Sequence, residues 1–306
     1  MRSPTQLDLS EKDIATIVSE GLGAGITGAE ELNGGTFATV WRAGLDDGRQ
    51  VVVKVAPPAS VRMLRYEAGM IPAEAEYFAL VAAHAPGVPV PEVLAASSDW
   101  IITALLPGSP LTSADSARAR TELGAAVRRV HTITGPHFGY TGDRAAGDDW
   151  PTAFTRIIEA LRADAADWHV PLPPLDGVVE RHHDVLATVT RPALLHFDLW
   201  DGNVLVGADG AMTGLVDGER YLYGDPLLDL VSPALFRRIE ELPDHPFLAG
   251  YRPEPFDESA RIRLALYRVH LYTLMIAEIP SRGLGRDRHD FLTGLLEAEL
   301  GALGER

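Results

Sequence analysis

The sequence predicts an α+β fold with two lobes, a small sheet-rich N-terminal lobe and a larger helical C-terminal lobe. Short apolar runs rich in β-branched residues, separated by glycine turns, are concentrated before about residue 105. After that point, apolar residues recur at helical spacing in longer segments. Strands followed by helices, without regular alternation, are typical of this class. We therefore expect lobes over residues 1–105 and 106–306, with a ligand site between them.

The N-terminal lobe begins with a predicted helix over residues 10–21, for which Ser10 is a suitable N-cap. It is followed by a strand–turn–strand over residues 31–43, a turn at residues 46–48 and a buried strand over residues 51–55. Residues 60–84 are predicted to be helical, with Pro72 in the first turn of a helix that runs to about residue 84. A loop into an edge strand over residues 88–94 and a strand over residues 100–106 complete the lobe.

The C-terminal lobe is predicted to be helical, with a short hairpin in its middle. The predicted helices cover residues 115–133, 151–163, 175–189, 256–280 and 286–303. The hairpin consists of apolar runs over residues 194–206 and 212–216, which flank a turn at Asp209-Gly210.

Composition excludes several classes of function. The formal net charge of −16 disfavours nucleic acid as a partner, because phosphate binding needs clustered basic residues. The chain has no cysteine, which excludes disulfides, thiolate catalysis and Cys-ligated zinc. No secretory signal and no apolar run long enough for a membrane span is present. We therefore expect a cytoplasmic protein without membrane contact. A monomer or weak dimer is a separate expectation.

The strongest chemical signal lies in residues 195–206. Asp198 and Asn203 stand five residues apart, just before a β-like run. A hairpin would bring Asp217 back beside Asn203. Carboxylate and amide oxygens are the ligands that Mg²⁺ prefers, so Asn203 and Asp217 could hold the metal, which leaves Asp198 to accept a proton from an alcohol. A calcium site or a set of solvated loop acids is the structural alternative.

This pattern resembles the catalytic loop and metal-binding aspartate of protein kinase-like folds, and in detail the aminoglycoside phosphotransferase and choline kinase-like family. That family has a later Gly-Asp-Pro-x-x-Asp-Leu element, which this chain matches at residues 224–230. The resemblance implies a bilobal protein kinase-like fold, with supporting rather than catalytic roles for Asp225, Asp229 and His196. One departure is Phe197, where the family usually has glycine; a bulky side chain there could narrow the site or shield it from water.

A lysine inside an apolar strand needs a compensating partner. By the resemblance, Lys54 contacts the nucleotide phosphates and pairs with a helix glutamate. Glu74 is the preferred partner, and Glu67 and Glu76 are its competitors. The alternative for Lys54 is an edge-strand lysine that points to water.

Two backbone segments are expected to bind the nucleotide. Gly34, Gly35 and Thr36 precede a strand ahead of Lys54, and glycine allows backbone N–H groups to approach phosphates. By the resemblance, the backbone of Ala104 and Leu106 hydrogen-bonds adenine at the lobe junction. Both segments would look the same as ordinary turns or linkers.

The expected function is ATP- and Mg²⁺-dependent phosphorylation of a small-molecule hydroxyl. The acidic balance and the resemblance favour a cationic, polyhydroxylated acceptor such as an aminoglycoside antibiotic, hence a role in antibiotic resistance. Asp143, Asp201 and Glu219 are candidate contacts for the cation, although solvated surface acids are the simpler interpretation. A sugar-amine or fructosamine-type kinase is the alternative, because the run Asp-Leu-Trp-x-Gly-Asn resembles fructosamine kinases. A non-catalytic nucleotide-binding module and a protein kinase are less favoured.

Overall fold

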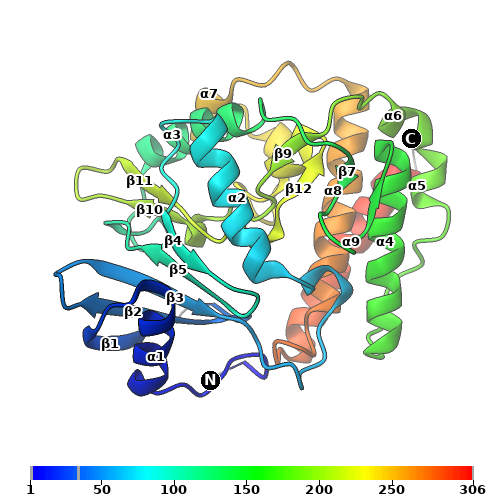
Figure 1. The fold of residues 1–306 in the computed structure, drawn as a ribbon. Coiled ribbons are helices and arrows are strands. Elements are labelled where there is room, and N and C mark those ends of the chain that lie inside the picture. Colours follow the sequence, from blue (N-terminus) through cyan, green and yellow to red (C-terminus); the bar gives the residue numbers. More distant parts are fainter. Residues whose placement is uncertain (1–2, 33–34, 305–306) are drawn as a thin grey trace.

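The computed structural model describes residues 3–32 and 35–304. Its N-terminal part is a five-stranded antiparallel sheet in the order β1-β2-β3-β5-β4, which stands at the lower left of Figure 1. The strands are β1 (Ile26–Leu32), β2 (Thr39–Leu45), β3 (Gln50–Val55), β4 (Val93–Ala96) and β5 (Trp100–Ala104). The predicted hairpin turn at residues 46–48 and the predicted edge strand β4 are both confirmed.

Helices cover both faces of this sheet. Helix α1 (Glu11–Leu22) begins at a Ser10 cap, as predicted, and its buried Ile14 and Val18 join the cluster that contains Val53 and Ile102. Helix α2 (Met70–His84) packs against the other face, where Ile101 lies. Because side chains alternate along a strand, Lys54 lies on the face opposite Val53 and hence on the α2 side.

The segment ahead of α2 was predicted to be helical from residue 60, and this prediction is wrong for residues 60–69. Only one 3₁₀ turn forms there, η1 (Arg65–Glu67), in which the Glu67 carboxylate accepts from the Leu64 amide at 2.8 Å. Gly69 then adopts φ 68°, a left-handed conformation that interrupts the helical path before α2 begins. Pro72 lies in the first turn of α2, as expected.

The rest of the chain is mainly helical. Its longer helices are α3 (Ala117–Val130), α4 (Trp150–Asp167), α8 (Glu258–Ala277) and α9 (Arg286–Gly304), and its short ones are α5 (Val178–Arg181), α6 (His183–Ala187) and α7 (Pro246–Tyr251). The predicted single helix over residues 175–189 is therefore wrong, because it divides into α5 and α6 at His182.

Two small sheets lie among these helices. One has the order β11-β10-β6, the other β8-β7-β12-β9. Their strands are β6 (Ser109–Pro110), β7 (Phe138–Gly139), β8 (Ala146–Gly147), β9 (Ala193–Leu195), β10 (Val204–Val206), β11 (Met212–Leu215) and β12 (Leu222–Gly224). Further 3₁₀ turns are η2 (Asp201–Asn203), η3 (Gly218–Arg220), η4 (Pro226–Val231) and η5 (Ile239–Glu241).

The predicted α+β fold, with a sheet-rich N-terminal part and a helical C-terminal part, is confirmed (Figure 1). The division into lobes at residue 105 stays a prediction. None of the helices described is both long and apolar enough to cross a membrane.

Candidate active site

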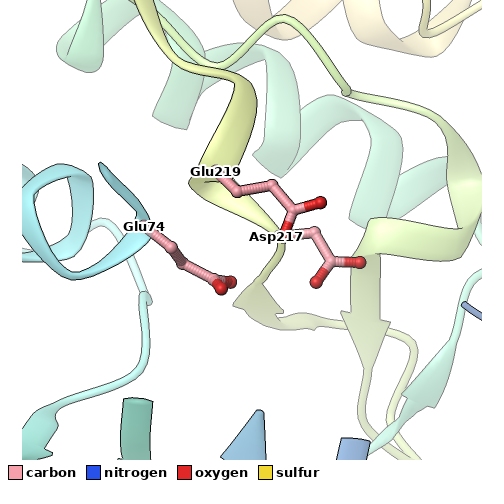
Figure 2. A group of neighbouring side chains, drawn as sticks. All are labelled: Glu74, Asp217 and Glu219. Carbon is pink, nitrogen blue, oxygen red and sulfur yellow. The ribbon is translucent and has the colours of Figure 1, made fainter. Parts of the chain in front are cut away.

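Lys54 lies at the centre of a group of three carboxylates. Its ammonium is 2.9 Å from Glu74 Oε2 and 2.8 Å from Asp217 Oδ1, and it also donates to Glu219. Figure 2 shows these three acids converging from α2 and from the turn after β11. Burial would lower the pKa of Lys54, but the carboxylates outweigh it and hold that pKa well above its usual value. The lysine is therefore charged, and the water-facing alternative is excluded by its 7% exposure.

Glu74 is the helix glutamate that contacts Lys54, as the sequence predicted. Its two competitors lie elsewhere: Glu67 is buried against Arg282, and Glu76 is exposed. Burial raises the pKa of Glu74 to about 8, although Lys54 opposes that shift.

Glu219 was expected to be a solvated surface acid, and this expectation is wrong. It is 7% exposed and is paired with Lys54. The burial of Glu219 could have been predicted from the sequence Asp-Gly-Glu directly after an apolar strand. A 3₁₀ turn at that point places the glutamate beside the aspartate.

The hairpin β10–β11 brings Asp217 back to Asn203, as predicted. Val204 pairs with Leu215, and the Val216 amide donates to the Asn203 carbonyl at 3.0 Å. Asp217 itself has φ 61°, a left-handed conformation that turns the chain sharply after the strand. Its carboxylate remains 42% exposed, and Lys54 outweighs burial to lower its pKa.

Asp198 is held on one side only. The Asn203 amide nitrogen donates to the Asp198 carbonyl at 2.9 Å and to its Oδ2 at 3.1 Å. The Arg220 Nε lies 3.9 Å from the same Oδ2. Within the described chain Oδ1 of Asp198 has no hydrogen-bond partner. Burial raises the pKa of Asp198 to about 6, and Arg220 limits the shift.

Arg220 was not found from the sequence. Its guanidinium donates to Glu278 at 2.8 Å and lies 5.7 Å from the centroid of the Tyr66 ring, while the Tyr66 hydroxyl donates to the same Glu278. The Glu278 carboxylate therefore fixes the arginine beside Asp198. No short sequence motif links Arg220 to Glu278, because they are 58 residues apart.

The loop that carries Asp198 is supported from behind by Asp229. Its carboxylate accepts from the amides of His196 and Phe197 at 2.9 and 2.6 Å, which confirms the predicted supporting role. Asp225 was expected to support the same loop, and this expectation is wrong, because its side chain forms no hydrogen bond with that loop. Its carboxylate instead binds Arg263 and Tyr267 of α8, so it fixes that helix.

His196 acts as a scaffold, as expected. Its Nε2 lies 3.0 Å from the Val216 carbonyl, which can only accept, so Nε2 carries the proton. Its Nδ1 then accepts from the Asp198 amide at 3.2 Å. Both ring nitrogens are occupied by backbone groups, and burial lowers the pKa of this imidazole.

Phe197 does not narrow the site. It has φ 64°, which explains why the family usually has glycine there. Its ring is 1% exposed and stacks on His270 with a centroid separation of 4.6 Å. The expectation that it would narrow or shield the site is therefore wrong.

The structure describes most, but not all, of the two backbone segments that were predicted to bind the nucleotide. Gly34 lies outside the described residues, whereas Gly35 and Thr36 are exposed at the start of the loop before β2. The Ala104 amide already donates to the Glu92 carbonyl at 2.9 Å, so this amide is not free to bind adenine. The Leu106 amide has no partner in the part of the chain that is described.

Comparison with known proteins identifies the family of this chain. Residues 28–264 match the model of the phosphotransferase enzyme family. A protein of Escherichia coli (strain K12) named "Probable ketoamine kinase YniA" is 30% identical over 284 residues, which cover 86% of this chain and 90% of that protein.

Solved structures show the same fold. The "putative fructosamine-3-kinase" from Thermobifida fusca YX-ER1 superposes with a TM-score of 0.68 at 23% identity, over 95% of this chain and 99% of that one. Aminoglycoside phosphotransferase APH(4)-Ia gives a TM-score of 0.63 at 16% identity, over 95% of this chain and 98% of that one. With the family match over most of its length, the chain belongs to the phosphotransferase enzyme family and is a kinase that acts on a small molecule.

Proposed function

We propose that this protein transfers the γ-phosphate of ATP, with Mg²⁺, to a hydroxyl of a ketoamine, the adduct of a sugar and an amine. Asp198 is the catalytic base, Asn203 and Asp217 hold the metal, and Lys54 contacts the phosphates. The observation that carries the proposal is the one-sided restraint of Asp198, whose Oδ2 faces Asn203 and Arg220 while Oδ1 is left for the acceptor.

The residues at the metal position suit Mg²⁺. Because the amide nitrogen of Asn203 is turned to Asp198, its amide oxygen is directed elsewhere and can serve as a ligand. Asp217 contributes an exposed carboxylate on the adjacent strand end. A bound magnesium ion would neutralise charge on the transferred phosphate.

Lys54 must release a partner to contact a phosphate. Its ammonium donates hydrogen bonds to Asp217 and Glu219 and forms an ion pair with Glu74 at 2.9 Å. Asp217 is the most exposed of these acids, and it is also the proposed metal ligand. Engagement of Asp217 by the metal would therefore free one Lys54 donor while Glu74 and Glu219 keep the ammonium in place.

Asp198 can receive the acceptor's proton. With a pKa of about 6 it is mostly ionised at neutral pH and still basic enough to assist an alcohol. The hydroxyl would donate to Oδ1, and Asn203 would keep the carboxylate in one orientation.

A ketoamine acceptor is favoured over an aminoglycoside. The relative at 30% identity carries the ketoamine kinase name, whereas the aminoglycoside enzymes share the fold at lower identity. Trp200, two residues after Asp198, is 36% exposed and offers a flat apolar surface to a sugar ring. Two carboxylates expected to attract a cation are engaged, Glu219 by Lys54 and Asp201 by Arg120 at 2.5 Å.

The test is an acceptor panel. The purified protein is incubated with ATP and Mg²⁺ and with fructosyl-lysine, ribosyl-lysine, free fructose, kanamycin or hygromycin B. Product is identified by mass spectrometry, so that ADP release to water is not counted. We expect kcat/KM for a ketoamine to exceed that for either antibiotic by about 100-fold or more, because a site built to hydrogen-bond one acceptor leaves polar groups unpaired when another acceptor binds. Faster phosphorylation of an antibiotic would reject the ketoamine assignment and keep the kinase chemistry.

A further inference from the structure

Residues 3–7, here called the N-terminal strap, lie against residues 35–39, here called the glycine loop. The strap precedes α1, and the loop precedes β2. The two segments are joined at one end by the Leu7 amide, which donates to the Thr39 hydroxyl at 2.8 Å, and this hydroxyl donates back to the Leu7 carbonyl at 3.3 Å.

Two strap side chains bind three carbonyls of the glycine loop. The Thr5 hydroxyl donates to the Thr36 carbonyl at 2.8 Å. The Gln6 side-chain amide donates to the carbonyls of Gly35 and Ala38, both at 3.1 Å. Thr5 is fully buried, so water cannot replace the Thr36 carbonyl as the acceptor for its hydroxyl.

The strap also reaches the helical part of the protein. The Ser3 hydroxyl donates to the Ser281 carbonyl at 3.4 Å, just beyond the end of α8. The next residue, Arg282, lies 5.3 Å from the centroid of the Phe37 ring, which is itself part of the glycine loop. The loop is therefore fixed between the strap and the end of α8.

This arrangement orients the backbone amides of the loop. In a trans peptide, the C=O of one residue and the N–H of the next point in opposite directions, and the described residues contain no cis peptide. When the carbonyls of Gly35 and Thr36 are bound by the strap, the amides of Thr36 and Phe37 point away from it. Neither amide has a hydrogen-bond partner among residues 3–32 and 35–304.

These two free amides precede the strand that crosses Lys54. Thr39 pairs with Val55, and Val40 pairs directly with Lys54 in the neighbouring strand. Consecutive outward N–H groups in a turn form a concave anion site. Gly35 has no atom near the position of an added Cβ, so the approach to this turn is open.

We infer that Thr5 and Gln6 are positioning residues for nucleotide phosphates. By binding the loop carbonyls, they present the Thr36 and Phe37 amides to the phosphate chain next to Lys54. This inference rests on the proposed ATP-dependent function. The strap should therefore strengthen binding of the nucleotide phosphates and have no effect on binding of the nucleoside.

The test compares four variants by calorimetric titration with MgATP and with adenosine. Thr5→Val keeps the shape of the side chain and removes its hydroxyl, whereas Thr5→Ser retains the hydroxyl. Gln6→Glu replaces the donor amide with an acceptor at a partly exposed position, so it tests the strap without a buried change. Thr16→Val removes an exposed hydroxyl on α1 and is the matched control.

We expect Thr5→Val and Gln6→Glu to raise the Kd for MgATP about tenfold, the effect of one lost hydrogen bond in a restrained site. Adenosine affinity should stay within about twofold of the parent in every variant, and Thr5→Ser should bind MgATP like the parent. If both Thr5→Val and Gln6→Glu bind MgATP like the parent, or if they lose as much affinity for adenosine as for MgATP, the role of the strap is wrong and the proposed function is unaffected. A parent protein that does not bind MgATP overturns the proposed function as well.

Discussion

The side-chain amide of Asn203 donates to both the carbonyl and the Oδ2 of Asp198, five residues earlier in the chain. One residue thus closes the loop and restrains the carboxylate. Its nitrogen is used by the protein, which leaves its oxygen for a metal. In the proposed mechanism, this coupling would make the geometry of the loop and the position of the metal depend on each other. A short segment would then supply both the catalytic base and a metal ligand.

Arg220 should assist Asp198 without contributing to nucleotide affinity. Arg220→Met removes the cation 3.9 Å from Oδ2, and we expect kcat to fall about 10–100-fold because the carboxylate loses its second restraint. Arg220→Lys should recover part of that loss. The Kd for MgATP, measured by titration, should stay within about threefold in both. A larger loss in MgATP affinity than in kcat would place Arg220 in nucleotide binding instead.

Asp217 should control magnesium-dependent nucleotide binding. We expect Asp217→Asn to raise the Kd for MgATP by about 10–100-fold, with adenosine affinity unchanged, since only the metal-linked phosphates lose a ligand. Asp209→Asn, an exposed acid in the same hairpin, is the control and should behave like the parent. If Asp217→Asn binds MgATP as tightly as Asp209→Asn does, the metal assignment is wrong.

At Phe197, a glycine variant should be more stable than an alanine variant, the reverse of the usual order. Its ring is buried, so Phe197→Ala should cost about 3–5 kcal/mol of unfolding free energy. Phe197→Gly also loses the ring but relieves left-handed strain of about 1–2 kcal/mol, so we expect it to be more stable than the alanine variant. Urea unfolding measures both. An alanine variant more stable than the glycine variant would show that the positive φ is not strained.

His270 should make stability depend on pH. Burial lowers its pKa to about 3, whereas the unfolded chain has the ordinary value of 6.5. The unfolded state therefore binds the extra proton between those values, and stability is lost as pH falls below about 6.5. The loss from this group is about 2 kcal/mol between pH 7 and pH 5.

Urea unfolding at both pH values tests this expectation. His270→Phe should lose about 2 kcal/mol less than the parent between pH 7 and pH 5, whatever its stability at pH 7. His183→Phe removes a histidine whose side chain is 63% exposed, so its pH dependence should match the parent. Equal pH dependence in all three proteins would mean that His270 is not kept neutral by the fold.

The sequence predicted the parts of the site that local patterns encode. Loop length predicted that Asn203 lies beside Asp198, and the hairpin predicted that Asp217 returns to Asn203; the structure confirms both placements. Lys54 was identifiable because a lysine within a β-branched strand must find a carboxylate. Its partner Glu74 was predicted by resemblance, and the structure confirms their contact.

The parts that were missed depend on long-range packing. Arg220 is fixed by Glu278, and Thr5 binds Thr36, contacts that no local pattern records. Glu219 was assigned to the surface because an acid after a turn is usually solvated, whereas here the buried Lys54 draws it inward. The helical prediction for residues 60–69 failed because composition could not reveal the left-handed Gly69.

The most direct test of the account is the turnover of Asp198→Asn with a ketoamine acceptor, measured beside its MgATP affinity. Asparagine keeps the size of the side chain but cannot accept the proton, so we expect kcat to fall about 10²–10⁴-fold while the Kd for MgATP stays within about threefold. Asp201→Asn, an acid in the same loop that is paired with Arg120, should retain parental turnover. Turnover by Asp198→Asn close to that of the parent would contradict the assignment of Asp198 as the base on which the proposed reaction depends.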